Sequence, residues 1–271
     1  MQVSQLYIYP IKSLGGIALQ TAEITDRGFK HDRRWMLIDS NNRFISQREV
    51  AEMALLKVNI TSFGLEVFHV ADSDNIFKIP FGPYNGVSVP VSVWDTGCTA
   101  ILVSEAANEW FSNKLKIDCR LIYMNEEDRI LIDEKYNINN HINSFSDGFP
   151  ILVASEASLN DLNSRLDESL PMNRFRPNLV IKGTKPFEEN EIKEFSIGGI
   201  HFFGVKPCAR CVVTTIDQFT AVKGKEPLKT LATYRNYNNK ILFGENVIAM
   251  QTGTISVGDP VQVLQTKEAL I

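Results

Sequence analysis

Short runs of apolar and β-branched residues recur along the first half of the chain, separated by Gly, Asn and Asp. Runs of this length between turn-forming residues are typical of β-strands. We expect strands at residues 2–9, 35–39, 43–46, 55–60, 65–70, 75–79 and 87–94. Because many short strands protect their edges by closing or sandwiching, the pattern predicts a barrel-like β fold.

The second half adds a few helices to further strands. Segments 104–115 and 155–166 each begin with a serine that suits a helix N-cap, and segment 227–235 has proline in its first turn. Strands are expected at 119–124, 179–182, 200–205, 212–216, 247–252 and 261–265. The polar stretch 125–146 has no steady period and is expected to be a loop or an inter-domain connection. The predicted fold class is therefore α+β and dominated by β-structure.

Length and charge limit the classes of function. The 271 residues exceed a typical domain of roughly 100 to 200 residues, which favours two coupled domains or one large one. A net charge of −4 argues against a nucleic-acid polymer as partner, because phosphate binding needs concentrated Lys and Arg. The sequence shows neither a secretion leader nor an apolar run of about 18 residues, so we expect a cytoplasmic protein without membrane association.

Two of the four cysteines, Cys208 and Cys211, form a close pair. The residues after them are β-branched and predict a strand, which disfavours a thioredoxin-like centre, where the first cysteine begins a helix. A structural zinc site would need two more ligands, and Cys98 and Cys119 are distant in sequence. Two small buried thiols beside a turn remain an open alternative.

The basic setting of this pair favours a functional thiol. Lys206 and Arg210 lie close to Cys211 in sequence and would stabilise a thiolate that could bind a soft metal. A single thiolate suits an oxo-molybdenum centre whose other sulfur ligands come from an organic cofactor. From the residues alone this is a hypothesis.

Further basic and polar side chains form possible anion-binding groups. Lys12 and Ser13 follow the first expected strand, and a loop with these groups could hold a phosphate. Arg174 and Arg176 would share a face of an extended segment, and guanidinium groups match a phosphate or the carbonyl edge of a pterin. Taken singly, each of these groups could also be an ordinary surface residue.

Taken together, these segments resemble the MOSC family, and more closely the branch that contains the mitochondrial amidoxime-reducing component and its bacterial relatives. The resemblance rests on Tyr-Pro-Ile-Lys-Ser at 9–13, Asp-Arg-Arg-Trp at 32–35, Ser-Glu-Ala-Ser-Leu at 155–159 with Leu-Asn-Ser-Arg at 162–165, Arg-Phe-Arg-Pro-Asn at 174–178, Cys-Ala-Arg-Cys-Val-Val-Thr-Thr-Ile-Asp at 208–217, Pro-Leu-Lys-Thr-Leu at 227–231 and Gly-Thr-Ile-Ser-Val-Gly-Asp at 253–259. These motifs span nearly the whole chain in the order that the family has.

The resemblance implies an N-terminal β-barrel domain at 1–120 and a MOSC β-barrel at 121–271, with a molybdenum-pterin cofactor between them. It implies that Cys211 supplies the protein thiolate to molybdenum and that Asp217 shapes the site near the metal as a second catalytic residue. The cofactor contacts it implies are Lys12, Ser13, Arg33, Ser155, Arg174, Arg176, Asn178 and Arg210. The family also leaves binding of pyridoxal phosphate open.

The activity implied is two-electron reduction of small N-oxygenated substrates, such as amidoximes, hydroxylamines and hydroxylated nucleobases, in which the oxygen leaves as water. Some relatives carry a ferredoxin-like domain, but this sequence has no cysteine after Cys211. We therefore expect a separate electron-donor protein of ferredoxin, flavodoxin or flavin-reductase type. Two alternatives are a sulfur carrier that holds a persulfide on Cys211, and a protein that only binds or stores the cofactor.

Overall fold

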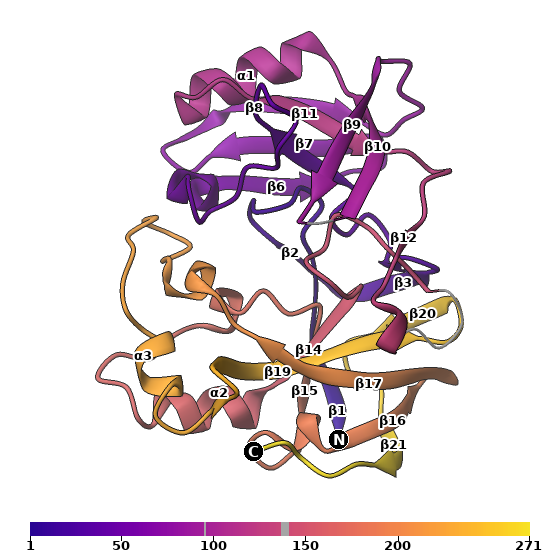
Figure 1. The fold of residues 1–271 in the computed structure, drawn as a ribbon, viewed down its shortest axis with the longest axis vertical. Helices are drawn as coiled ribbons and strands as arrows, with labels where there is room; N and C mark the ends of the chain where they lie inside the picture. The colour runs from indigo at the N-terminus through magenta and orange to yellow at the C-terminus, as the bar shows by residue number, and fades with distance from the viewer. Residues whose placement is uncertain (95, 137–140) are drawn as a thin grey trace.

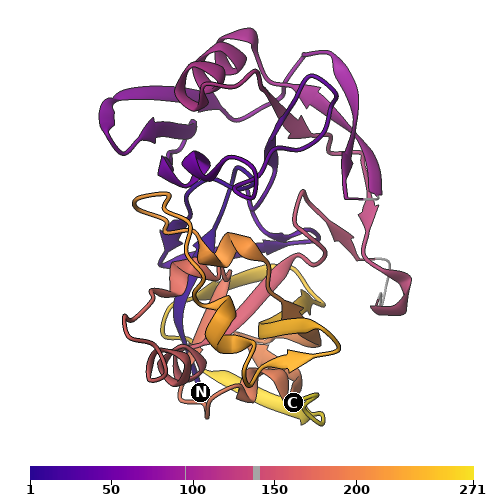
Figure 2. The same ribbon diagram turned by 60° about the vertical axis from the view of Figure 1, so that its left-hand side comes forward.

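The computed structural model describes residues 1–94, 96–136 and 141–271. They form two bodies that lie one above the other along the longest axis of the molecule (Figures 1 and 2). The N-terminal body contains the strands β5 to β11 and the helix α1, and the C-terminal body contains most of the remaining elements. The cleft described below lies where loops of the two bodies meet.

The N-terminal body is built from two small antiparallel sheets and one helix. One sheet has the order β5-β11-β10-β9 and the other β6-β7-β8. The elements are β5 (Trp35–Ile38), η1 (Ala51–Leu55), β6 (Leu56–Ile60), β7 (Gly64–His69), β8 (Asp72–Pro80), β9 (Ser88–Val93), β10 (Thr96–Leu102), α1 (Glu105–Leu115) and β11 (Arg120–Met124). As expected, Ser104 caps α1 by accepting a hydrogen bond from the N–H of Ala107 at 3.1 Å, and the helix buries Phe111 against both sheets.

The C-terminal body is a curled sheet of nine strands in the order β2-β1-β15-β14-β19-β17-β16-β21, with β18 paired to β19. Its strands are β1 (Gln2–Ile8), β2 (Ile17–Leu19), β14 (Ile151–Ser155), β15 (Leu179–Lys182), β16 (Ile192–Ile197), β17 (Ile200–Ala209), β18 (Asn236–Tyr237), β19 (Lys240–Ala249) and β21 (Val261–Thr266). Backbone hydrogen bonds join Val3 to Asp259 and Gly258, so the segment that leads into β21 returns to β1. This contact closes the sheet and protects its edges.

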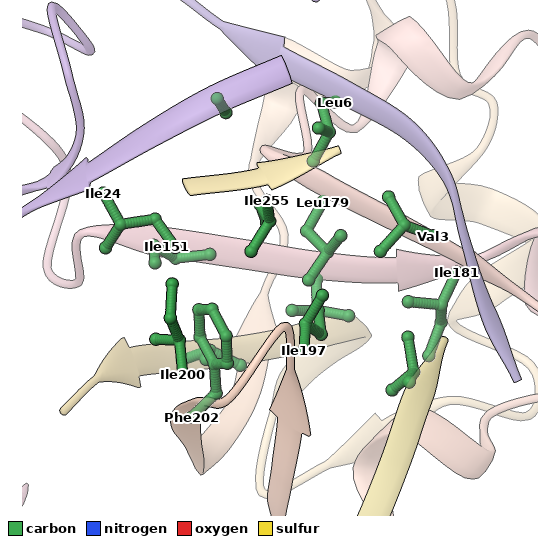
Figure 3. Packing of buried hydrophobic residues seen from close by; sticks show 14 of the residues in the cluster. Val3, Leu6, Ile24, Ile151, Leu179, Ile181, Ile197, Ile200, Phe202 and Ile255 are labelled. Atoms are coloured by element: carbon green, nitrogen blue, oxygen red, sulfur yellow. The ribbon is translucent and has the colours of Figure 1, made fainter. Parts of the chain in front are cut away.

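Two α-helices, several 3-10 turns and a small sheet complete this body. The helices are α2 (Glu156–Asn163) and α3 (Leu228–Leu231), with the 3-10 turn η3 (Met172–Arg174), and the sheet pairs β20 (Gly253–Ser256), β3 (Thr21–Thr25) and β4 (Gly28–Phe29). Figure 3 shows the apolar interior, where Ile151, Ile197 and Phe202 converge from three strands with no exposed surface. Each such side chain contributes about 1.5–3 kcal/mol on burial, and together they fix the sheet that carries the cleft.

The two bodies are not consecutive segments of the chain. β1 pairs with β15 and β3 pairs with β20 of the C-terminal body, and β2 pairs with β1, whereas β11 extends to Met124 within the N-terminal body. The chain starts in one body, crosses to the other and returns. Local sequence cannot indicate this exchange, because strand pairing joins segments that lie far apart in the chain.

Three expected elements differ in the structure. The strand expected at 43–46 is reduced to isolated bridges, of Phe44 with Ile38 and of Arg43 with Ser92. Residues 212–216 were expected as a strand, but Val212–Thr215 form the 3-10 turn η5. The hydroxyls of Thr214 and Thr215 donate to the backbone carbonyls three residues earlier, at 2.9 and 2.8 Å, which stabilises a turn in place of a ladder. The expected loop at 125–146 contains a short pair of strands, β12 (Ile130–Leu131) and β13 (Ile142–Asn143), while residues 137–140 of that loop lie outside the described residues.

No helix formed by the described residues combines the length and the apolar character needed to cross a membrane.

Candidate functional site

An open cleft with about 770 Å³ of empty space lies where loops of the two bodies meet. Seven of the ten residues expected at the site line it: Lys12, Ser13, Arg33, Arg176, Asn178, Arg210 and Cys211. They come from loops after β1, before β5, before β15 and after β17. The fold therefore gathers side chains that are up to about 200 positions apart in the sequence.

Cys211 carries a free, half-buried thiol and lies two residues after the end of β17. The guanidinium Nη2 of Arg48, from the N-terminal body, lies 3.4 Å from its Sγ. The other cysteine of the pair, Cys208, has a different partner, because Nη1 of Arg210 donates to its sulfur at 3.0 Å. The two thiols of the pair thus have different cationic partners from different bodies.

No three side chains of His, Cys, Asp or Glu gather as a metal-ligand set within the described parts of the chain. A structural zinc site built from the protein alone needs about four such ligands. A metal on Cys211 would therefore take most of its ligands from a bound cofactor or substrate.

A chain of charged groups leads from Cys211 to Lys12. The Lys12 ammonium donates to the carbonyl of Phe145 and to the carboxylate of Asp147, each at 2.6 Å, and Arg48 lies 3.8 Å from the same carboxylate. Burial opposes the charge on both groups and lowers the pKa of Lys12. The nearby cations Lys12 and Arg48 outweigh this burial at Asp147, so its pKa lies well below the usual range.

Arg33 and Arg176 both place their guanidinium over the ring of Tyr9, at 4.3 and 4.2 Å from its centroid. The guanidinium of Arg33 pairs with the buried carboxylate of Asp32 and also donates to the side-chain oxygen of Asn178 at 3.2 Å. The backbone of Arg176 is hydrogen-bonded, but its guanidinium forms no hydrogen bond or ion pair with any residue that the structure describes. Burial, with a smaller effect of Arg33, lowers its pKa to about 10, so it remains a cation at neutral pH.

Three residues that line the cleft have a left-handed backbone conformation, which residues other than glycine rarely adopt. The φ angles are 68° at Ser13, 50° at Arg33 and 54° at Arg176. Such conformations cost about 1–3 kcal/mol and persist where surrounding contacts impose them, commonly at ligand sites. Asn178 supplies part of that support, because its amide bonds the carbonyl of Tyr7 and the N–H of Leu152, both at 3.2 Å.

Three expected site residues lie outside the cleft. Ser155 is completely buried, caps α2 and donates to Glu189 at 2.9 Å. Arg174 is buried behind η5, where it bonds the carbonyl of Thr214 at 2.9 Å and the carboxylate of Asp217 at 3.1 Å. The side chains of Ser155 and Arg174 thus bond other groups of the protein, and we propose no direct contact of either residue with a cofactor.

Asp217 in turn organises the loop after η5. Its carboxylate accepts hydrogen bonds from the N–H groups of Phe219 and Thr220, both at 2.9 Å, and from the Thr220 hydroxyl at 3.0 Å. These bonds with the nearby cation Arg174 outweigh partial burial and lower the pKa of Asp217. Asp217 therefore lies outside the cleft, and the contacts of its carboxylate hold the loop after η5.

Sequence reasoning missed three residues of the cleft region: Arg48, Asp147 and Trp94. Arg48 lies over the Trp94 ring at 4.5 Å, and the Trp94 indole N–H donates to Asp147 at 3.3 Å. Each belongs to a polar turn of the kind found on any protein surface. Only the Ser-Asp-Gly sequence at 146–148 marks a tight turn, and it carries no sign of a site.

Two β-rich bodies share a cleft lined by several cations and by the two thiols Cys208 and Cys211. The sequence profile of the MOSC N-terminal β-barrel domain matches residues 1–118, and that of the MOSC domain matches residues 140–262. The chain belongs to the MOSC family. The resemblance and the fold class predicted from the sequence are both confirmed.

Several curated proteins are similar over almost the whole chain. The human mitochondrial amidoxime-reducing component 1 is 32% identical over 97% of this chain and 82% of its own length. The bovine mitochondrial amidoxime-reducing component 2 is 30% identical, over 96% of this chain and 82% of its own. A rice molybdenum cofactor sulfurase is 30% identical over 90% of this chain, which is 32% of that longer protein.

Among solved structures, the YuaD protein of Bacillus subtilis matches 96% of this chain and 93% of its own with a TM-score of 0.43 and 11% identity.

Proposed function

We propose that this protein binds a molybdenum-pterin cofactor through Cys211 and reduces small N-oxygenated compounds. The relatives that match it over most of their length are amidoxime-reducing components. The observation that carries the proposal is the free guanidinium of Arg176 in the same cleft as Cys211. A half-buried cation without a carboxylate partner in the protein raises the free energy of the folded state unless a bound anion pairs with it. A pterin cofactor carries a phosphate that could be this anion.

The residues of the cleft fit this cofactor in two further respects. The Nε of Arg210 is buried and has no hydrogen-bond partner, which leaves a donor for a polar edge at the cleft. Cys211 offers one thiolate, the kind of ligand that a molybdenum centre with organic dithiolate ligands still accepts. When bound, the cofactor supplies a metal that takes oxygen from the substrate and exchanges two electrons.

The chain would then contribute binding, charge and proton placement. Arg48 stabilises the negative charge on Cys211, and Arg176 anchors the anionic end of the cofactor. The ion pair of Lys12 and Asp147 keeps a proton on the Lys12 nitrogen at the cleft. The overall conversion takes an N–OH group, two electrons and two protons to an N–H group and water, and a separate redox protein supplies the electrons.

The second candidate function is a sulfur carrier with a persulfide on Cys211. A molybdenum cofactor sulfurase is among the relatives, and the contact with Arg48 would stabilise a persulfide anion as well as a thiolate. A carrier of this kind has no need of the distant Arg176, whose place in the cleft favours the reductase.

The test is to purify the protein from a host that makes molybdenum cofactor and to measure bound molybdenum, pterin and benzamidoxime reduction with a reduced dye as donor. We expect about one molybdenum per chain in the wild type, loss of metal and activity in Cys211→Ala, and retention of metal in Cys208→Ala. A wild type without molybdenum, or full activity in Cys211→Ala, would contradict the proposal. A persulfide on Cys211 in mass spectra without metal would support the carrier.

A further inference from the structure

Three exposed apolar side chains follow Cys211 in the chain and form what we call the apolar rim. They are Val212, Phe219 and Val222, with exposed fractions of 52%, 62% and 65%. The segment that carries them rises from the C-terminal body toward the N-terminal body before it enters α3 (Figures 1 and 2). Contacts with Arg48 and Lys57 of the N-terminal body keep it there.

The loop that carries the apolar rim is held in one conformation. The carboxylate of Asp217 bonds the backbone of Phe219 and Thr220, and the backbone N–H of Asp217 donates to Val222 at 2.9 Å. The ammonium of Lys57 donates to the carbonyl of Gln218 at 2.6 Å. Since the loop is already ordered, a partner that covers its apolar side chains loses little conformational entropy.

The exposed apolar side chains of the rim do not contribute to the stability of the folded protein through burial. Burying Phe219 would gain about 1.5–3 kcal/mol, but its side chain is 62% exposed, with the ammonium of Lys57 lying 5.5 Å from the centre of its ring. Large apolar side chains that a fixed loop presents to solvent together are typical of an interaction surface. Here the surface adjoins the predicted metal ligand, because Val212 is bonded directly to Cys211.

The segment that carries the apolar rim is positively charged although the whole chain carries −4. Residues 206–229 contain the cations Lys206, Arg210, Lys223, Lys225 and Lys229 and the acidic residues Asp217 and Glu226. Asp217 is already neutralised by Arg174, and Lys223 and Lys225 are exposed beside Val222. A partner with surface carboxylates would be attracted and oriented by this local excess.

We propose that the apolar rim, with Lys225 beside it, is the docking site for a small acidic electron-transfer protein. This inference rests on the proposed reductase function, which requires such a donor. Docking here would place the donor's redox group beside Val212, so that each electron passes from the reduced donor toward the metal ligand Cys211 over a short covalent path. Two oxidation events of the donor supply the two electrons that one substrate molecule consumes.

The test compares two donors for the loaded holoenzyme. One is a reduced viologen dye, which needs no docking, and the other is an acidic [2Fe-2S] ferredoxin kept reduced by its NADPH-dependent reductase. The variants are Phe219→Ser, Val222→Ser and Lys225→Glu. The matched control is Leu264→Ser, since Leu264 is 42% exposed on β21, at the other end of the C-terminal body (Figures 1 and 2).

We expect each variant of the apolar rim to raise the KM for ferredoxin about tenfold, as loss of a central interface side chain does. The dye-driven rate and the molybdenum content should stay within about twofold of the wild type, since an exposed side chain supports no catalytic contact. Raising the salt from about 0.05 M to about 0.3 M should weaken the ferredoxin reaction of the wild type more than that of Lys225→Glu.

An unchanged ferredoxin KM in these variants, or an equal rise in Leu264→Ser, would overturn the docking site. So would a dye-active enzyme that ferredoxin does not reduce at any salt concentration. If instead the protein lacks molybdenum and dye-driven activity, the proposed function itself fails. A self-association that the Phe219→Ser variant abolishes would assign the surface to a second copy of this chain and also overturn the proposal.

Discussion

The guanidinium of Arg48 lies 3.4 Å from the sulfur of Cys211, although the two residues belong to different bodies and are 163 positions apart in the chain. The same guanidinium lies over Trp94 and approaches Asp147. The N-terminal body therefore does more than cover the cleft, because it supplies the charge that faces the predicted metal ligand. A MOSC domain without this partner body would present its cysteine without that cation.

The contact predicts that Arg48 activates the Cys211 thiol. In the cofactor-free protein, Arg48→Leu should slow alkylation of Cys211 by iodoacetamide about tenfold at neutral pH, because the anion loses a charge-assisted hydrogen bond. Site-resolved mass spectrometry gives the rate. Arg43→Leu is the control, since Arg43 is exposed in the same segment and has no contact with the thiol. Equal rates in Arg48→Leu and the wild type would contradict the assignment.

Arg176 and Arg33 provide a matched pair, since both lie over Tyr9 but only Arg33 has a buried carboxylate partner. We expect Arg176→Met to lose most of the bound molybdenum with little change in the free energy of unfolding, because no protein partner is orphaned. Arg33→Met should lower that free energy by about 3–5 kcal/mol, since Asp32 would be left buried without its cation.

Metal analysis and urea unfolding of the cofactor-free proteins check both outcomes. If Arg176→Met unfolded as readily as Arg33→Met, then Arg176 would be a structural residue and the argument for an anionic ligand would lose its main support.

Asp217 is expected to hold the loop beside Cys211 without touching the reacting atoms. Asp217→Ala removes three hydrogen bonds and the partner of Arg174, so stability should fall by about 1–3 kcal/mol and trypsin should cut faster after Lys223 and Lys225. Asp161→Ala, at an exposed pair with Arg165, is the control for losing an ion pair. An intact loop with abolished dye-driven activity would restore the catalytic role expected from the family resemblance.

Glu245 should make stability depend on pH. It is buried in the C-terminal body beside Lys267, and burial raises its pKa to about 7, above its usual value of 4.5. The folded protein therefore holds a proton that the unfolded chain releases, and this contribution to stability is full below about pH 4.5 and is lost as the pH rises through 7. The loss amounts to about 3 kcal/mol.

Urea unfolding at several values between pH 5 and pH 8 measures this effect as the difference between wild type and Glu245→Gln. The variant should lack the decline, whereas Glu194→Gln, at a more exposed pair with His201, should keep it. Parallel pH profiles of wild type and Glu245→Gln would show that Glu245 is not the group responsible.

Much of the fold could be predicted because its elements follow local rules. Ser104 and Ser155 cap helices as their positions suggest, and the alternating runs at 55–60 and 65–70 pair as β6 and β7. The prediction failed at 212–216, where β-branched residues usually favour a strand but threonine hydroxyls compete for the backbone. Strand propensity reflects each residue type alone. It includes neither the hydrogen bonds of the threonine hydroxyls nor whether a neighbouring strand is available for pairing.

The candidate site could be predicted where the motifs name it, as at Lys12, Arg176 and Cys211, all of which line the cleft. Arg174 and Asp217 belong to the same motifs, yet they hold the loop behind the cleft. A motif records that residues occur together, and it does not distinguish a side chain that contacts a ligand from one that positions its neighbour. Arg48 and Asp147 could not be found at all, because their turns become part of the site only when distant strands pair.

The sequence by itself determined most of the strands, the capped helices and the family, since each depends on neighbouring residues or on motifs. The tertiary structure alone decided that β1 belongs to the C-terminal body, that Arg48 faces Cys211 and that the apolar rim borders the predicted metal ligand. These relations depend on which loops the closed sheets bring together. Pairing over such distances is set by the packing of whole sheets, and no local pattern in the chain encodes it.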